Sequence, residues 1–152
     1  GPPLPAGSPQ KRGHDRRRFD SPLQRAGAKA VAAYALAMEK YEIDTALESA
    51  IQLARACNQL IESSAPWKLA KDPAQADRLD AVLYHLAESL RLVAILLTPV
   101  LPEASQGILS QLNVTATPCL ADAVWGGLPD GHVLGTPVPL FPRLEAPPSP
   151  EA

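Results

Sequence analysis

Apolar residues recur at intervals of three and four positions between Pro22 and Asn113, which is the spacing of one face of an α-helix. Turn-forming residues interrupt this pattern, so it predicts four helices, over residues 22–41, 44–65, 73–98 and 102–113. Prolines and glycines replace the pattern after residue 113 and exclude another long helix there. The sequence therefore predicts an all-α fold that is followed by an irregular tail.

Each predicted helix has one apolar face that we expect to be buried. In the first two helices these faces consist of Gly27, Val31, Tyr34, Met38 and Tyr41, and of Leu47, Ile51, Ala54, Cys57 and Ile61. In the last two they consist of Leu79, Val82, Leu83, Leu86, Leu90, Val93 and Leu97, and of Leu101, Ser105, Ile108, Leu109 and Leu112. Asp44 is the predicted N-cap of the second helix, and Asn113 is the predicted stop of the fourth. His85 borders the third face, where we expect a structural role.

The stretch Asn58–Lys71 joins the second predicted helix to the third and carries one of the two tryptophans. Pro66 disfavours the helical conformation for Ala65, so the upstream helix should end there. A proline also suits the first turn of a new segment, where its missing N–H costs nothing. Trp67 is thereby placed at a corner between two helices.

A tryptophan at such a corner can serve binding or packing. It can stack on an unpaired base while Lys68 and Lys71 contact phosphates, or it can close the end of a helical bundle as a core residue. Asn58 lies beside the apolar face of the second helix, where its amide either hydrogen-bonds to the corner or faces solvent. Both alternatives remain open for each of these residues at the level of sequence.

The charges are unevenly distributed along the chain. The net charge is −2, but residues 1–25 contain six cations and two acids, a local charge of +4, which leaves −6 for the remainder. The basic cluster Lys11–Arg18 could touch an RNA backbone or form a solvated loop. A helical bundle with an acidic balance cannot attract RNA through a general positive field, so any RNA contact has to be local.

The sequence contains no phosphate-binding glycine loop, no dinucleotide-binding glycine pattern and no nucleophile with a matching base. Cys57 and Cys119 have no metal-ligand spacing, and Cys57 is expected in the core, so no metal site is predicted and a reducing compartment fits. The apolar run Leu92–Leu101 is too short to span a bilayer and contains Pro99, so no membrane partner is expected.

The chain resembles the anticodon-binding domain of methionyl-tRNA synthetases in a signature of spaced residues, which here are Asn58, Ile61, Pro66, Trp67 and Lys71. The segment Pro139–Arg143 is similar to the end of that family's bundle region, and the resemblance runs from about Val31 to Arg143. It implies an antiparallel helical bundle of the class I synthetase anticodon-binding type.

The resemblance also implies a function. Trp67 would stack on a base of the CAU anticodon of methionine tRNA, with Pro66 fixing the corner and Asn58 supporting it. Lys68 and Lys71 would be phosphate contacts. The family's His-Ile-Gly-His-like and Lys-Met-Ser-Lys-like catalytic elements are absent here, so the chain is expected to hold no catalytic residue and no cofactor. The parent, a cytoplasmic methionine–tRNA ligase, would attach methionine in its catalytic domain with ATP and Mg²⁺.

The family carries an asparagine and an arginine that read anticodon bases on a helix upstream of this resemblance, and neither has a counterpart here. The resemblance therefore implies that this first helix is missing. We expect exposed apolar surface on the second or third predicted helix, and marginal stability.

Two rival interpretations remain. The chain could be the anticodon-binding domain of a related class I synthetase for valine, leucine, isoleucine or cysteine, since these share the bundle architecture. It could also be a non-enzymatic helical module that binds proteins, with Trp67 in its core. Under either interpretation, the corner at Trp67 would not bind methionine tRNA.

The predicted organisation has three parts: a basic linker over residues 1–25, the bundle over residues 26–113, and a tail over residues 114–152 that packs back on the bundle. Trp125, Leu140 and Phe141 are the expected anchors of the tail, with one short turn at 121–125. Residues 145–152 are expected to be disordered.

Overall fold

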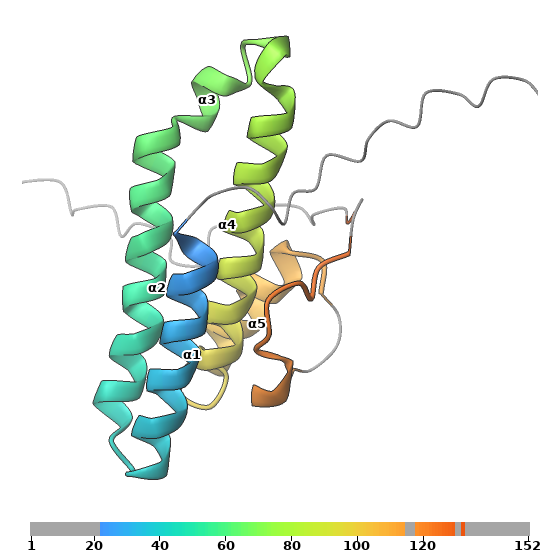
Figure 1. The fold of residues 1–152 in the computed structure, drawn as a ribbon. Coiled ribbons are helices and arrows are strands. Elements are labelled where there is room, and N and C mark those ends of the chain that lie inside the picture. The colour runs from blue at the N-terminus through green and yellow to red at the C-terminus, as the bar shows by residue number, and fades with distance from the viewer. Residues whose placement is uncertain (1–21, 115–117, 130–131, 133–152) are drawn as a thin grey trace, which may run out of the picture.

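The computed structural model describes residues 22–114, 118–129 and 132, and within these ranges the secondary structure is entirely helical. The first three of the four longer helices alternate in direction, which confirms the all-α antiparallel bundle (Figure 1). They are α1 (Leu23–Glu39), α2 (Ile43–Ser64), α4 (Ala76–Leu97) and α5 (Pro102–Gln111). Three short elements join or follow them: α3 (Pro66–Leu69), η2 (Pro73–Gln75) and η3 (Leu120–Asp122).

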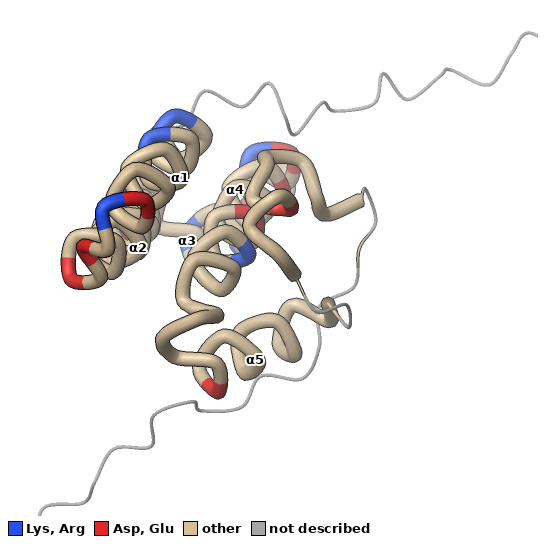
Figure 2. Tube along the Cα trace, turned by 90° about the horizontal axis from the view of Figure 1, so that it is seen from below, with Lys and Arg blue, Asp and Glu red and all other residues tan. Residues whose placement is uncertain are grey.

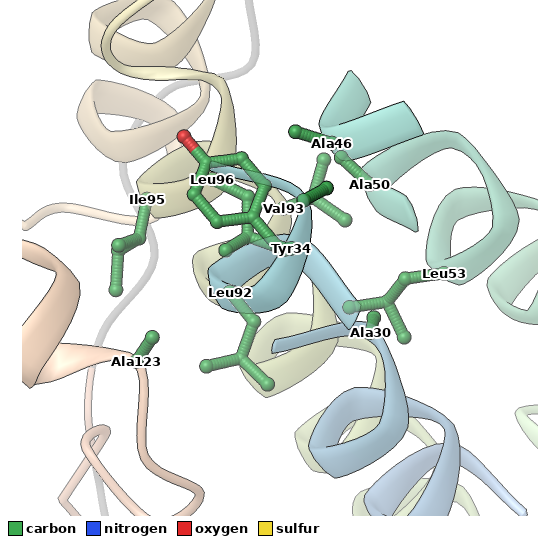
Figure 3. Close-up of a cluster of buried hydrophobic side chains, with 11 residues drawn as sticks. Ala30, Tyr34, Ala46, Ala50, Leu53, Leu92, Val93, Ile95, Leu96 and Ala123 are labelled. Carbon is green, nitrogen blue, oxygen red and sulfur yellow. The ribbon is translucent and has the colours of Figure 1, made fainter. Parts of the chain in front are cut away.

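The long helix α4 is the centre of the bundle. It contacts α1, α2 and α5, and the short elements α3, η2 and η3 also pack on it. The largest cluster of buried side chains joins Tyr34 of α1, Leu53 of α2 and Leu92 of α4, among others (Figure 3). A second cluster contains Leu23, Cys57, Leu60, Val82 and Leu86. Because α4 has neighbours on several sides, it is buried over much more than one stripe.

The buried face of α2 differs from the predicted one. The residues that α2 buries are Ala46, Ser49, Ala50, Leu53, Cys57, Leu60 and Ser64, and of the predicted set only Cys57 is among them. Ile51 is 42% exposed, and Leu47, Ala54 and Ile61 are half-buried. The alanine-rich stripe allows α1 and α4 to approach closely, so the helix is rotated by about one residue from the prediction.

The predictions for the other faces were also partly wrong. Leu83 and Leu90 of α4 are 49% and 37% exposed, because α4 turns its neighbouring stripe inward. Tyr41 is 89% exposed because it lies beyond the end of α1 in a left-handed conformation (φ 58°). Leu101 is 47% exposed at the start of α5. Asp44 lies in the first turn of α2, whose N-cap is Glu42.

Several helix ends follow the sequence signals. The third predicted helix starts as expected after Asp72, whose carboxylate accepts a hydrogen bond from the Ala74 N–H at 3.0 Å. Asn113 has φ 56° directly after α5, as expected for a residue that stops a helix. The first helix begins at Leu23, which lies inside the predicted linker 1–25. Leu140, Phe141, Lys11–Arg18 and residues 145–152 lie outside the described residues.

Exposed apolar surface was expected on the second or third predicted helix, and both α2 and α4 carry it. Ile43 and Ile51 of α2 and Leu83 and Leu90 of α4 are all between 37% and 49% exposed. Cations and acids are interspersed along α1 and α2, whereas α5 carries a single charged side chain, Glu103, at its start (Figure 2). Neither α1 nor α2 presents a continuous face of positive charge.

Candidate nucleic-acid interface

The corner between α2 and α4 is built from backbone hydrogen bonds. Helix α2 ends at Ser64, and Ala65 follows it in the left-handed region (φ 45°, ψ 66°). Pro66 then opens the single turn of α3, as predicted for a proline without an N–H to satisfy. The N–H of Lys68 donates to the Ala65 carbonyl at 2.8 Å, and the N–H of Ala70 donates to that of Pro66 at 2.9 Å. The corner is thus closed on both sides of Trp67.

Two serine hydroxyls complete the end of α2. Ser63 and Ser64 both donate to the carbonyl of Leu60, the former at 3.3 Å. These are local side-chain bonds to a carbonyl near the end of the helix, of the kind that serine commonly makes. Ser64 is buried, so its hydroxyl needs this partner.

Trp67 projects away from the bundle at this corner. Its side chain is 53% exposed, whereas Leu69, two residues later, packs against the second hydrophobic cluster. Residues two positions apart on a helix point in nearly opposite directions, so the inward Leu69 accounts for the outward Trp67. The alternative in which Trp67 closes the core as a buried plug does not fit this exposure.

The remaining predicted contact residues are exposed or half-buried. Lys68, Lys71 and Asn58 are exposed, and Pro66 is half-buried. Asn58 therefore faces solvent on α2, and the hydrogen bonds that close the corner come from the backbone and the two serines. The structure places an aromatic ring and two cations on the surface at the corner, and an amide on the surface of α2. These groups can stack on a base and contact phosphate.

A buried ion pair on α4 was missed by the sequence reasoning. Glu88 and Arg91 form two hydrogen bonds, Nε to Oε1 at 3.0 Å and Nη2 to Oε2 at 3.2 Å, and both side chains are almost fully buried. The Glu88 carboxylate also accepts the N–H groups of Gly126, Gly127 and Leu128 at 2.7 to 3.1 Å. Two charged residues three positions apart within the otherwise apolar second half of α4 were the available signal.

This ion pair fastens the segment 118–129 to the bundle. Arg91 donates to the carbonyls of Asp122, at 2.9 Å, and Val124. A Cβ on Gly127 would lie 2.4 Å from Cζ of Arg91, so any other residue there would push the guanidinium from its place in the ion pair. Trp125 packs against both hydrophobic clusters and lies 5.1 Å from the ring of His85, which confirms its predicted anchoring role.

The histidine and the cysteine considered as candidate functional residues are buried in the core. His85 is fully buried beside Trp125, and Cys57 is buried in the second cluster, where burial raises the pKa of its thiol. Within the described part of the chain, no group of three or more His, Cys, Asp and Glu side chains could hold a metal ion. Among the helices of that part, none has the length and apolar content needed to cross a membrane.

Comparison with known proteins shows the family of the chain. A family model described as the anticodon binding domain of methionyl tRNA ligase matches residues 12–148. The chain belongs to this family. It is 44% identical over 131 residues to the methionine–tRNA ligase of Bacillus subtilis and 41% identical over 129 residues to that of Enterococcus faecalis. Each match covers 84% of this chain.

A solved structure agrees with these relatives. The apo form of Mycobacterium tuberculosis methionyl-tRNA synthetase superposes with a TM-score of 0.66 at 26% identity, over 82% of this chain and 26% of that one. The comparisons favour the methionyl family over the related synthetases and over a general helical interaction module. The chain spans about a fifth of the length of the curated relatives that it matches.

Proposed function

We propose that this chain recognises the CAU anticodon of methionine tRNA and that Trp67 supplies the stacking surface. The observation that carries this proposal is the 53% exposure of Trp67 at a corner held by backbone hydrogen bonds, in a chain of the anticodon-binding family. Exposure alone does not point to a partner, because single exposed aromatic residues such as Tyr41 are common, so the proposal depends on exposure, the fixed corner and the family together. An unpaired base of a tRNA loop is a partner that such a ring fits.

The charges around the corner fit local contacts. Lys68 within α3 and Lys71, two residues after it, are both exposed and can meet phosphates next to the stacked base. The chain has a net charge of −2, so its affinity should come from the stack and a few phosphates and not from a broad positive surface. Stacking of one base on an aromatic side chain contributes about 1–3 kcal/mol. Asn58 is the fourth proposed contact, through its exposed amide.

The larger protein that we propose is a methionine–tRNA ligase of the cytoplasm. Its catalytic domain, outside this chain, would use ATP and Mg²⁺ to attach methionine to the tRNA that the bundle recognises. The relatives that carry this name support the proposal. The two described cysteines are free, which is compatible with a reducing compartment.

The test is the binding of methionine tRNA anticodon stem-loops to the 152-residue chain, measured by fluorescence anisotropy at two salt concentrations. The loops are the CAU loop and three copies in which one anticodon nucleotide in turn lacks its base. Trp67→Ala should weaken binding of the intact loop by about 5- to 100-fold, and one abasic loop should show a similar loss. The two losses should not add, because they remove the same stack.

Tyr41→Ala is the matched control. Tyr41 is also an exposed aromatic residue, but it lies beyond the opposite end of α2. The Tyr41→Ala variant should bind every loop with the affinity of the native chain. If the folded native chain does not distinguish the intact loop from the abasic loops, the proposal is overturned; the same holds if Tyr41→Ala and Trp67→Ala lose equal affinity.

A further inference from the structure

The backbone that leads into Trp67 has an unusual conformation at Ala65. Three non-glycine residues among those described have a positive φ: Tyr41, Ala65 and Asn113. Asparagine tolerates this region, and Tyr41 closes α1 in an exposed turn with no proline after it. Ala65 is the one of the three that precedes a proline.

The backbone conformation of Ala65 goes against two separate conformational preferences. A left-handed conformation brings the Cβ of an alanine close to the following carbonyl oxygen. A following proline favours an extended conformation for the residue before it. A backbone held against such preferences persists only where its surroundings enforce it, and residues of this kind cluster at binding and catalytic sites.

The surroundings of Ala65 do enforce this conformation. Its N–H donates to the carbonyl of Ile61 at 3.0 Å, and its own carbonyl accepts the N–H groups of Lys68, at 2.8 Å, and Leu69, at 3.3 Å. Leu69 in turn packs into the second hydrophobic cluster. Hydrogen bonds therefore fix the backbone where the turn begins, at Ala65, and packing of Leu69 holds the turn against the bundle.

We propose that Ala65 and Leu69 are positioning residues for Trp67, which they hold facing outward before any RNA arrives. This inference rests on the proposed function of Trp67 and assigns the preparation of its ring to these two residues. Left-handed Ala65 turns the chain from α2 across to α4, and Leu69, two residues after Trp67, directs the indole away from the bundle. A ring that is already placed loses little freedom on stacking, so the corner raises affinity without contacting the base.

The test uses substitutions at Ala65 and stem-loop binding by the 152-residue chain. Ala65→Val places a β-branched side chain where a left-handed conformation is a genuine outlier, and Ala65→Asn places a residue that accepts it. Ala65→Val should bind the intact CAU loop about tenfold more weakly, while binding of the abasic loop that marks the stacked position stays native. Ala65→Asn should bind both loops as the native chain does.

Tyr41→Val is the matched control, because it introduces the same β-branched residue at a left-handed position beyond the other end of α2. It should lower the melting temperature without changing the affinity for either loop. Circular dichroism checks that each variant is folded. If Ala65→Val does not fold, Leu69→Ala replaces it with the same expected tenfold loss.

The outcomes separate the two proposals. If Trp67→Ala weakens binding but a folded Ala65→Val, or Leu69→Ala in its place, binds the intact loop normally, the positioning role is wrong and the proposed function survives. Equal losses for Ala65→Val and Tyr41→Val would also overturn the positioning role. If Trp67→Ala binds as the native chain does, both proposals are wrong.

Discussion

The two tryptophans of this chain occupy contrasting surroundings. Trp67 is 53% exposed at a corner closed by backbone hydrogen bonds, with two exposed lysines beside it. Trp125 is half-buried, packs against both hydrophobic clusters, and belongs to a segment that a buried ion pair fastens to α4. The difference shows that the role of an aromatic residue follows from what anchors its backbone and which side its neighbours bury. Trp125 joins parts of the fold, and Trp67 is left available for a partner.

The strongest way to break this contrast is to remove the anchor of Trp125. Glu88→Ala should lower the free energy of unfolding by about 3–5 kcal/mol, because it leaves Arg91 buried without its partner. Three backbone N–H groups lose their acceptor at the same time. Urea unfolding followed by circular dichroism measures the change. Glu48→Ala is the control, since its ion pair with Arg55 is exposed and should contribute within about 0.5 kcal/mol.

Truncating each tryptophan compares the two sites directly. Trp125→Ala should destabilise the bundle by about 3 kcal/mol, because it removes a side chain that joins both clusters. Trp67→Ala should change the free energy of unfolding by no more than about 0.5 kcal/mol, since its ring is largely exposed. Parallel urea titrations measure both values. Similar losses in the two variants would mean that Trp67 is part of the core.

A smaller effect of opposite sign is expected at the entry to the Trp67 corner. Ala65→Gly relieves a left-handed alanine but gives the unfolded chain more freedom, so it should stabilise the protein by about 0.5–1 kcal/mol. Thermal unfolding would show a higher melting temperature. Gly27→Ala is expected to act in the other direction, because its Cβ would lie 2.9 Å from Cδ1 of Leu92. A lower melting temperature for Ala65→Gly would show that the alanine is not strained.

The smallest effect concerns pH in the segment that carries Trp125. A hydrogen bond from the Cys119 N–H, at 2.8 Å, lowers the pKa of Asp122. A carboxyl whose pKa is lowered by folding adds stability above its unfolded pKa of about 3.9, and this part is lost as pH falls through the folded value. Asp122→Asn should therefore weaken the acid dependence of the melting temperature below about pH 4. An unchanged dependence would show that the hydrogen bond is absent in solution.

Local rules in the sequence predicted where most helices begin and end. Pro66 ended α2, Asp72 and Pro73 began the third predicted helix, and Asn113 stopped α5, because these residues act on the backbone of their immediate neighbours. The exposure of Trp67 at the corner could not be predicted in the same way. Whether Trp67 faced solvent depended on Leu69 finding a place in a cluster made by distant helices.

The amino-acid sequence by itself determined the helical class, the corner at Pro66 and the residues that can stack and carry charge there. Only the tertiary structure decided which stripe each helix buries, because α2 and α4 both carry more apolar residues than one face can hold. Packing of α1 and α4 on the alanine stripe left Ile51 exposed, and neighbours on several sides of α4 buried Glu88, Arg91 and His85. A periodic pattern records which residues could be buried, whereas the choice among them depends on where the partner helices lie.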